Sequence, residues 1–282
     1  MRVAKFTSSL RFAVAGSPLS TPAPGGTVEG LKQAKKLGIH AMEIEWVQSV
    51  PTHPERMALI RKTAGELDMT LTVHAPYYIN LNSPEKEKLA ASIVRITSAL
   101  AMSELAGVRS VCVHAAFNLG QPPDKVYDNV RRAVDTILKK KSKLFPHVNL
   151  ALETMGRATQ FGTLEEVLRI SKEFDLYPCV DSAHMHARTN GLVNTAKEWH
   201  EMLDLYAKYL GKPSLGYMHL HYSGIAYGEK GEKHHLPLRG SDARWKDFVG
   251  VLKERKVCGT LVCESPAMEK DTLLLQKTYL AA

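Results

Sequence analysis

The stretch AMEIEWVQSVPTHPERMALIRKTAGELDMTLTVHAP, residues 41–76, contains the pattern that decides the fold. It begins with a short apolar run, AMEIEW, and ends with another, LTVHAP. Between them lies a longer amphipathic segment, predicted to be a helix over residues 55–67. Two short apolar strands joined by a helix indicate a parallel pair with a right-handed crossover.

The same unit repeats along the chain. The expected strands are RFAVAG (11–16), AMEIEW (41–46), LTVHAP (71–76), SVCVHA (110–115), NLALET (149–154), YPCVDSAH (177–184), GYMHLHYS (216–223) and GTLVCESP (259–266). The expected helices cover 27–37, 55–67, 84–106, 124–141, 164–174, 194–209, 243–256 and 269–279. Eight such units close a barrel of roughly 250 residues. The 282 residues, without a linker or low-complexity tract, therefore predict one α/β domain over 1–282, a (β/α)₈ TIM barrel.

Several helix ends carry local signals. Ser83-Pro84 predicts a proline in the first turn of a helix, and Thr163 with Glu166 predicts a capping box. Three glycines are placed to end helices: Gly38, Gly107 and Gly211. The segment 223–239 is the longest polar stretch after a strand, and we expect it to be a functional loop.

The composition is that of a globular chain with a basic surface. Apolar residues make up 44% and charged residues 23%, and Lys plus Arg outnumber Asp plus Glu by 37 to 29, for a net charge of +8. This excess indicates either a solvated basic surface or a polyanionic partner, such as nucleic acid or a phosphate ester.

The cysteines and the first residues point to the cytoplasm. The four cysteines (Cys112, Cys179, Cys258 and Cys263) form no CxxC pair, and three lie in apolar runs, as buried reduced thiols do. The apolar core of the first segment, residues 12–15, is too short for a signal peptide and is predicted to belong to the first strand. Because no window approaches the ~18 apolar residues of a membrane helix, we expect no membrane contact.

Histidines and acids lie at the ends of the third to eighth strands. They are His74, His114, Glu153, Asp181 with His184, His219 with His221, and Glu264. In a barrel these ends share the C-terminal face, where active sites form. Any one of them could be a hydrogen-bonded or salt-bridged structural residue. Together they predict a cation cluster, because buried carboxylates need a counter-charge.

The donor types suggest the metal. Imidazole and carboxylate without cysteine suit zinc, manganese or iron. With Glu232 and His234 there are about nine candidate ligands, which calls for two or three ions, and the central Glu153 could bridge a pair. Paired ions about 3.5–4 Å apart activate water and neutralise an attacked phosphate, so the cluster favours phosphate-ester chemistry.

Several motifs resemble those of the endonuclease IV family. They are HAPYYINLNSP (74–84), VHAAF around His114, ALET around Glu153, VDSAH around Asp181, MHLHYSG around His219 and CESP around Glu264. The resemblance covers about residues 41–264. It implies a TIM-barrel apurinic/apyrimidinic endonuclease with three zinc ions. In that family a metal-bridging hydroxide attacks the phosphate 5′ of an abasic sugar, leaving a 3′-hydroxyl.

The resemblance also implies roles for individual residues. One zinc would be held by His74, His114 and Glu153, and a second by Glu153, Asp181, His219 and Glu264. The third would be held by His184, His234 and Glu232, where the family typically has Asp. The catalytic residues would be Glu153, Asp181 and Glu264.

The expected DNA contacts are Tyr77, Lys230, Lys233 and Arg239. Tyr77 lies where the family inserts a side chain beside the lesion; packing against the barrel rim is the alternative. The basic residues of the seventh loop would meet the DNA backbone or be simply solvated. The chain departs from the family in WVQSVPTHPER, which has no arginine before Arg56, and in TMGRATQFG, which lacks the usual Asn and Gly pattern.

The remaining polar residues near the cluster are expected to support it. His186, His221 and His235 each lie within two residues of an expected ligand, and we expect them to hold ligands or substrate phosphate. Glu43 and Glu45 would line the mouth, or be solvated or salt-bridged.

Three functions remain open at this point. The first is a zinc-dependent phosphodiesterase that incises DNA at abasic or otherwise damaged sites, acting as a cytoplasmic monomer. The second is a single-metal sugar isomerase or epimerase of the same barrel type. The third is a non-catalytic protein that binds damaged nucleic acid. The number of ions per chain and incision of abasic DNA separate them.

Overall fold

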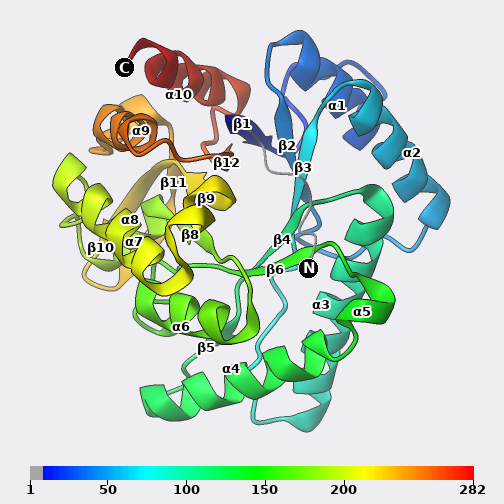
Figure 1. Cartoon of the computed structure of the whole chain (residues 1–282), viewed down its shortest axis with the longest axis vertical. Helices are drawn as coiled ribbons and strands as arrows, with labels where there is room; N and C mark the ends of the chain where they lie inside the picture. Colours follow the sequence, from blue (N-terminus) through cyan, green and yellow to red (C-terminus); the bar gives the residue numbers. More distant parts are fainter. Residues whose placement is uncertain (1–8) are drawn as a thin grey trace.

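The computed structural model describes residues 9–282 and has eight parallel strands at its centre (Figure 1). They follow the order β6-β4-β3-β2-β1-β12-β9-β8. Their bounds are β1 (Leu10–Ala15), β2 (Ala41–Glu45), β3 (Thr70–His74), β4 (Ser110–Val113), β6 (Asn149–Leu152), β8 (Cys179–Asp181), β9 (Met218–Tyr222) and β12 (Gly259–Cys263). Each corresponds to one of the eight expected strands, so the predicted TIM barrel is confirmed. Residues 1–8, part of the expected N-terminal segment, lie outside the described residues.

The barrel closes between β6 and β8 through few bonds. Glu153 forms an isolated parallel bridge with Cys179, and the Thr154 N–H donates to the Cys179 carbonyl at 3.1 Å. The Asp181 N–H donates to Thr154 Oγ1 at 2.8 Å, and Asn149 Nδ2 donates to the backbone just before β8 at 2.7 Å. Side chains therefore replace much of the strand ladder at this seam.

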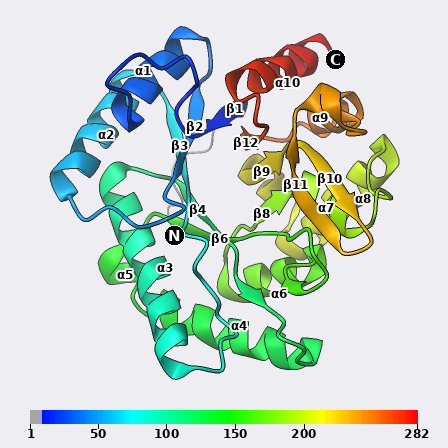
Figure 2. The same ribbon diagram turned by 180° about the vertical axis from the view of Figure 1, so that it is seen from behind.

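Helices surround the strands in the order expected from their amphipathic patterns (Figures 1 and 2). They are α1 (Thr27–Lys36), α2 (Pro54–Glu66), α3 (Lys86–Ala106), α4 (Pro123–Leu138), α5 (Lys141–Leu144), α6 (Leu164–Phe174), α8 (Ala196–Leu210), α9 (Trp245–Glu254) and α10 (Glu269–Ala281). The α4 helix buries Val126, Val130, Val134 and Ile137 at a spacing of three or four residues, as a helix facing a sheet does. The helix expected over 124–141 is α4, which ends at Leu138, and the short α5 beyond it was not expected.

Local sequence signals account for some of the helix ends. Thr163 accepts from the Glu166 N–H at 3.2 Å, and the Glu166 carboxylate accepts from the Thr163 N–H at 2.8 Å, so the capping box is confirmed. Gly107 ends α3 in the left-handed region, with φ 71°. The prediction for Ser83-Pro84 is wrong. Because Glu85 keeps an extended backbone, α3 begins only at Lys86 and Pro84 lies before its first turn.

Several short structured elements were not expected. The helix α7 (Ser182–Arg188) follows β8 directly, and β5 (Ala116–Phe117) pairs with β7 (Gln160–Phe161). The long polar loop over 223–239 is instead an antiparallel hairpin of β10 (Gly224–Gly228) and β11 (Gly231–Leu236), followed by the 3₁₀ turn η2 (Leu238–Gly240). A second 3₁₀ turn, η1 (Lys212–Gly216), precedes β9.

One helix in the described part of the chain, α3, is long and apolar enough to span a membrane by length and composition, which the sequence analysis did not anticipate. Its residues Ile96, Ala99 and Leu100 are fully buried in the core shared with the strands. A core helix of a barrel has these same features.

The side chains inside the barrel are polar or small, whereas those between the strands and the surrounding helices are apolar. Apolar residues of the strands and surrounding helices form the main cores. Alternate strand positions instead bring together small side chains inside, including Cys112, Ala151 and Cys179. A barrel of this type is ordinarily filled by Val, Ile and Leu. The small side chains leave space within the barrel for buried histidines and acids.

Candidate metal centre

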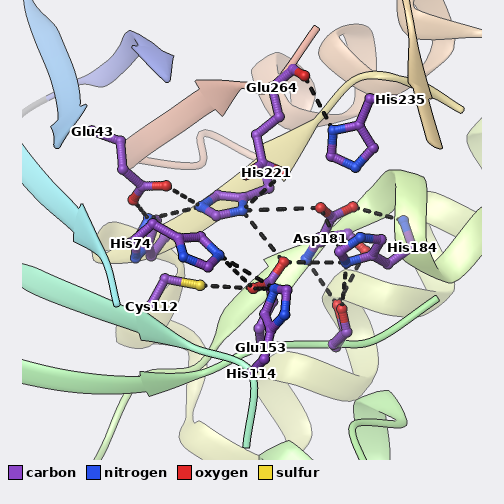
Figure 3. A network of polar contacts seen from close by, with 12 residues as sticks. Glu43, His74, Cys112, His114, Glu153, Asp181, His184, His221, His235 and Glu264 are labelled. Atoms are coloured by element: carbon purple, nitrogen blue, oxygen red, sulfur yellow. Dashed lines mark hydrogen bonds and ion pairs between the residues drawn. The ribbon is translucent and has the colours of Figure 1, made fainter. Parts of the chain in front are cut away.

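The ends of six strands bring histidines and acids into one cluster (Figure 3). Parallel strands of a barrel end at the same face, so side chains at equivalent positions meet there. The cluster contains His74, His114, Glu153, Asp181, His184, His221 and Glu264, and all but His114 and Glu264 are almost fully buried. Glu153 lies at its centre.

The first group of donors is His74, His114 and Glu153, the set that the resemblance to endonuclease IV implied. Glu153 Oε2 lies 2.9 Å from His114 Nε2 and 3.6 Å from His74 Nε2, and the two Nε2 atoms are 3.3 Å apart. Two donors about 2.0–2.1 Å from a tetrahedral zinc lie roughly 3.4 Å from each other. The spacing of this group therefore fits one ion.

The second group surrounds the other oxygen of Glu153. His221 Nδ1 lies 3.5 Å from Glu153 Oε1, 3.9 Å from Asp181 Oδ2 and 3.3 Å from Glu264 Oε2. Glu153 Oε1, Asp181 Oδ2 and His221 Nδ1 are all buried and have no hydrogen-bond partner. Buried polar atoms without a partner are costly. A cation between these atoms would satisfy all of them, so the group fits a metal ion.

His219, expected in the second group, lies elsewhere. It faces the barrel interior two residues before His221, with Nε2 2.9 Å from Glu43 Oε2 and Nδ1 3.2 Å from Ser110 Oγ. Because alternate residues of β9 point inward and the strand ends at Tyr222, His221 is the last inward side chain and reaches the rim. The structure thus puts His221 in the place expected for His219.

The third group lies at the start of α7. Asp181 Oδ1 accepts from the His184 N–H at 2.7 Å, which caps the helix and fixes His184 beside the rim. His184 Nε2 lies 3.5 Å from Glu232 Oε2, as expected, while donor atoms of Asp181, His184 and His235 lie within 4.8 Å of one another. His184 Nδ1 is 3.0 Å from the Thr154 carbonyl oxygen.

His234 does not join this group, because the hairpin contains a β-bulge. Glu232 pairs with Tyr227 but His234 pairs with Ala226, so Lys233 is an extra residue on β11. A bulge of one residue reverses the alternation of faces. Glu232 and His235 therefore share the inner face, and His234 is exposed on the other. His235 Nδ1 is 3.1 Å from the Glu264 carbonyl oxygen.

The hairpin is fixed to the barrel by contacts from both of its strands, near its tip. Near the tip, the Glu232 N–H donates to the Gly156 carbonyl at 3.1 Å. On β10, the Tyr227 hydroxyl donates to Asp242 Oδ2 at 2.6 Å, and the other oxygen of Asp242 is 3.1 Å from His186 Nε2. His186, expected to support a ligand, is thus part of the anchor of the strand that precedes Glu232 and His235.

The electrostatics of the cluster reflect several buried carboxylates close together. Burial opposes ionisation of Glu153, but nearby His114, His184 and His221 hold its pKa well below the usual range. Burial raises the pKa of Asp181 to about 7, even though His184 opposes the shift. These carboxylates require positive charge nearby, and either protonated histidines or metal cations supply it.

Two further buried groups lie beneath the rim. Cys112 Sγ donates to Glu153 Oε2 at 2.9 Å, and Glu43 is fully buried against His219 and His221. For Glu43 the salt-bridged alternative therefore holds, and no role at the cluster was expected for Cys112. Cys112 lies two residues before the expected ligand His114, so the two-residue period of strands could have indicated its inward position.

The residues expected to contact DNA are all exposed. The Tyr77 ring is 49% exposed, and its centroid lies 5.1 Å from that of His74 and 5.4 Å from that of His114. Tyr77 therefore borders the first donor group directly. Lys230 and Lys233 are exposed on the hairpin, and Arg239 is exposed on η2.

Comparison with protein families matches residues 31–279 to the family described as xylose isomerase-like TIM barrel. The chain belongs to that family. Among curated members similar to this xylose isomerase-like barrel, an uncharacterized protein of Methanocaldococcus jannaschii is 37% identical over 270 residues, covering 96% of this chain and 97% of its own. A protein named "Probable endonuclease 4" from Mycoplasma pneumoniae is 25% identical over 170 residues, covering 58% of this chain and 57% of its own.

Solved structures of this type of barrel include proteins with different activities. Endonuclease IV from Thermus thermophilus has a TM-score of 0.71 at 19% identity, covering 95% of this chain and 98% of its own. A D-tagatose 3-epimerase-like protein has a TM-score of 0.70 at 17% identity, covering 96% and 97%. At these identities the likeness shows the fold only.

Proposed function

We propose that this xylose isomerase-like barrel is a metal-dependent phosphodiester hydrolase that cleaves DNA 5′ to abasic sites. The observation that supports it most is the position of Glu153. Its Oε2 faces His74 and His114, while its Oε1 faces His221 and lacks a hydrogen-bond partner. One carboxylate between two donor groups suits two neighbouring ions, the arrangement that phosphodiester hydrolysis uses.

Divalent ions bound here, zinc in our proposal, would neutralise the attacked phosphate and activate a water molecule. The chain's own residues then have distinct tasks. His74, His114, Glu153, Asp181, His221 and Glu264 would hold the ions of the first two groups, and His184, Glu232 and His235 those of the third. Tyr77 would contact the sugar or base beside the scissile bond. Lys230, Lys233 and Arg239 would bind the DNA backbone, since backbone contacts position a nucleic acid without selecting its sequence.

An incision assay on an end-labelled duplex with one abasic site tests the proposal. The zinc-loaded protein should cut 5′ to the site and leave a 3′-hydroxyl, and a chelator should abolish cutting. The same duplex without the lesion controls for nonspecific nuclease. Fully loaded protein that binds the abasic duplex but leaves it intact would instead indicate a non-catalytic binding protein.

A single-metal sugar epimerase is the second candidate. One observation favours it: within the second group Glu153 Oε1, Asp181 Oδ2 and His221 Nδ1 all lack a hydrogen-bond partner, whereas in the third group His184 Nδ1 already lies 3.0 Å from a carbonyl oxygen. One ion at this group would satisfy those three atoms. A stoichiometry of one ion per chain, together with epimerisation of a ketose and no DNA incision, would select this function.

A further inference from the structure

Beneath the rim, one carboxylate contacts two histidines of the same strand. Glu43, on β2, is fully buried, with Oε2 2.9 Å from His219 Nε2 and Oε1 2.9 Å from His221 Nε2. Figure 3 shows Glu43 on the side of the His221 ring opposite Glu153 and Asp181. Glu43 thus lies behind a donor of the second group and not in the mouth.

The protonation of the deeper ring follows from its neighbours. Asn149 Nδ2 donates to Ser110 Oγ at 3.1 Å, and the Asn149 amide is oriented by two backbone contacts of Tyr177, a donor and an acceptor. The Ser110 hydroxyl proton is therefore available for His219 Nδ1, 3.2 Å away. With Nδ1 accepting, His219 carries its proton on Nε2 and donates it to Glu43 Oε2.

The remaining oxygen of Glu43 then faces His221. A carboxylate only accepts hydrogen bonds, so Oε1 favours a proton on His221 Nε2. This leaves the lone pair of His221 Nδ1 directed at Glu153 Oε1 and Glu264 Oε2, where a cation would lie. The other tautomer would put an N–H group in the position of the ion.

We infer that Glu43 is a positioning residue that selects the metal-binding tautomer of His221. The inference rests on the metal centre of the proposed function, but not on its substrate. A carboxylate that holds the distal nitrogen of a metal-binding histidine orients the ring and raises its basicity. Here one carboxylate also fixes His219, so each of the two rings depends on one of its oxygens.

The test is Glu43→Gln, measured as cobalt(II) and zinc affinity with a competing chelator. An amide offers one acceptor oxygen and one NH₂ group, so it can accept from only one of the two rings. We expect affinity at the His221 group to fall about 10–100-fold, with the number of ions bound at saturation unchanged. Glu43→Asp, which retains two acceptor oxygens, should lose less.

A direct readout separates tautomer selection from loss of charge or of folding. Although burial opposes protonation, Glu264 and Glu43 raise the pKa of His221 well above its usual value, so the ring is compared at alkaline pH, where it is neutral. Nitrogen-15 NMR of the histidine rings in metal-free protein should then show His221 protonated on Nε2 in the wild type, and a raised Nδ1–H population in Glu43→Gln. The control is Glu104→Gln, which removes a surface contact of 2.7 Å between a glutamate and His147. This control should change neither affinity nor the His221 signal.

The outcomes are distinguishable. Unchanged affinity and tautomer in folded Glu43→Gln protein would overturn the role of Glu43 while leaving the metal centre intact. Loss of one whole ion would also overturn it, because Glu43 would then be a ligand with His219 and His221. A wild-type protein that binds no divalent ion would remove this inference and the proposed function together. Failure of DNA incision alone, with the affinity loss observed, would overturn only the proposed substrate.

Discussion

The donors carried by the barrel differ from those carried by the hairpin. His74, Asp181 and His221 belong to strands, are almost fully buried, and keep their positions as long as the barrel is closed. Glu232 and His235 belong to a two-stranded appendage, and both are partly exposed. The first set depends on the fold itself, whereas the second depends on a bulge at Lys233 and on a few side-chain contacts.

This difference indicates how such a centre can be built. A barrel with histidines and acids at its strand ends provides two donor groups around one shared carboxylate. A hairpin in the seventh connection then adds donors to a third group, which it shares with Asp181 and His184. The two parts should respond differently to mutation, because only the hairpin can shift without opening the barrel.

The largest effect is expected for the residue on which both barrel groups depend. Glu153→Gln keeps the size of the side chain but offers one acceptor oxygen instead of two, so it cannot serve both groups. We expect loss of at least one ion per chain by elemental analysis. We also expect a loss of incision beyond about 100-fold, the upper end for residues that only support a ligand. Glu104→Gln serves as the control, and retention of every ion in Glu153→Gln would contradict the shared role.

A smaller effect is expected on the hairpin, at His235. His235→Ala should weaken the third ion alone, lowering the stoichiometry by up to one while the two barrel groups stay loaded. The matched control is the neighbouring His234→Ala, which should leave ion content unchanged because that side chain faces outward. If His234→Ala lost the ion and His235→Ala did not, the bulge at Lys233 would be misplaced.

The smallest effect is expected from loosening the hairpin anchor. Tyr227→Phe removes the 2.6 Å hydrogen bond to Asp242, at a cost of about 0.5–1.5 kcal/mol in unfolding free energy. It should slightly lower third-ion affinity in a chelator titration. Tyr209→Phe removes a similar bond, to Glu165 on the outer surface, and should leave that affinity unchanged. Equal effects of the two variants on affinity would exclude a role for the anchor.

The sequence predicted the barrel because every strand is a short apolar run and every helix is amphipathic with recognisable ends. It also predicted His74 and His114 as donors, since each lies at or just beyond the end of a strand, and the resemblance to endonuclease IV implied their grouping with Glu153. These features depend on positions within single elements, which periodicity reveals.

The sequence did not determine the choice between neighbouring histidines. His219 and His221 share one face of β9, and only the length of the strand shows which reaches the rim. A β-bulge decides which of His234 and His235 faces the cluster. The bulge arises from pairing with β10, so it cannot be recognised from the sequence of β11 alone. The burial of Glu43 depends on contacts between β2 and β9, which lie far apart in the chain.

The sparse seam between β6 and β8 gives the cluster a second importance. Glu153 and Asp181 stand on opposite sides of this seam, where only a few bonds join the two edges of the sheet. A cation bound by both carboxylates would connect β6 and β8, the two strands of the barrel that share few hydrogen bonds. Metal binding and closure of the barrel would then be thermodynamically linked. Where metal is scarce, the free energy of unfolding of the whole protein would therefore be lower.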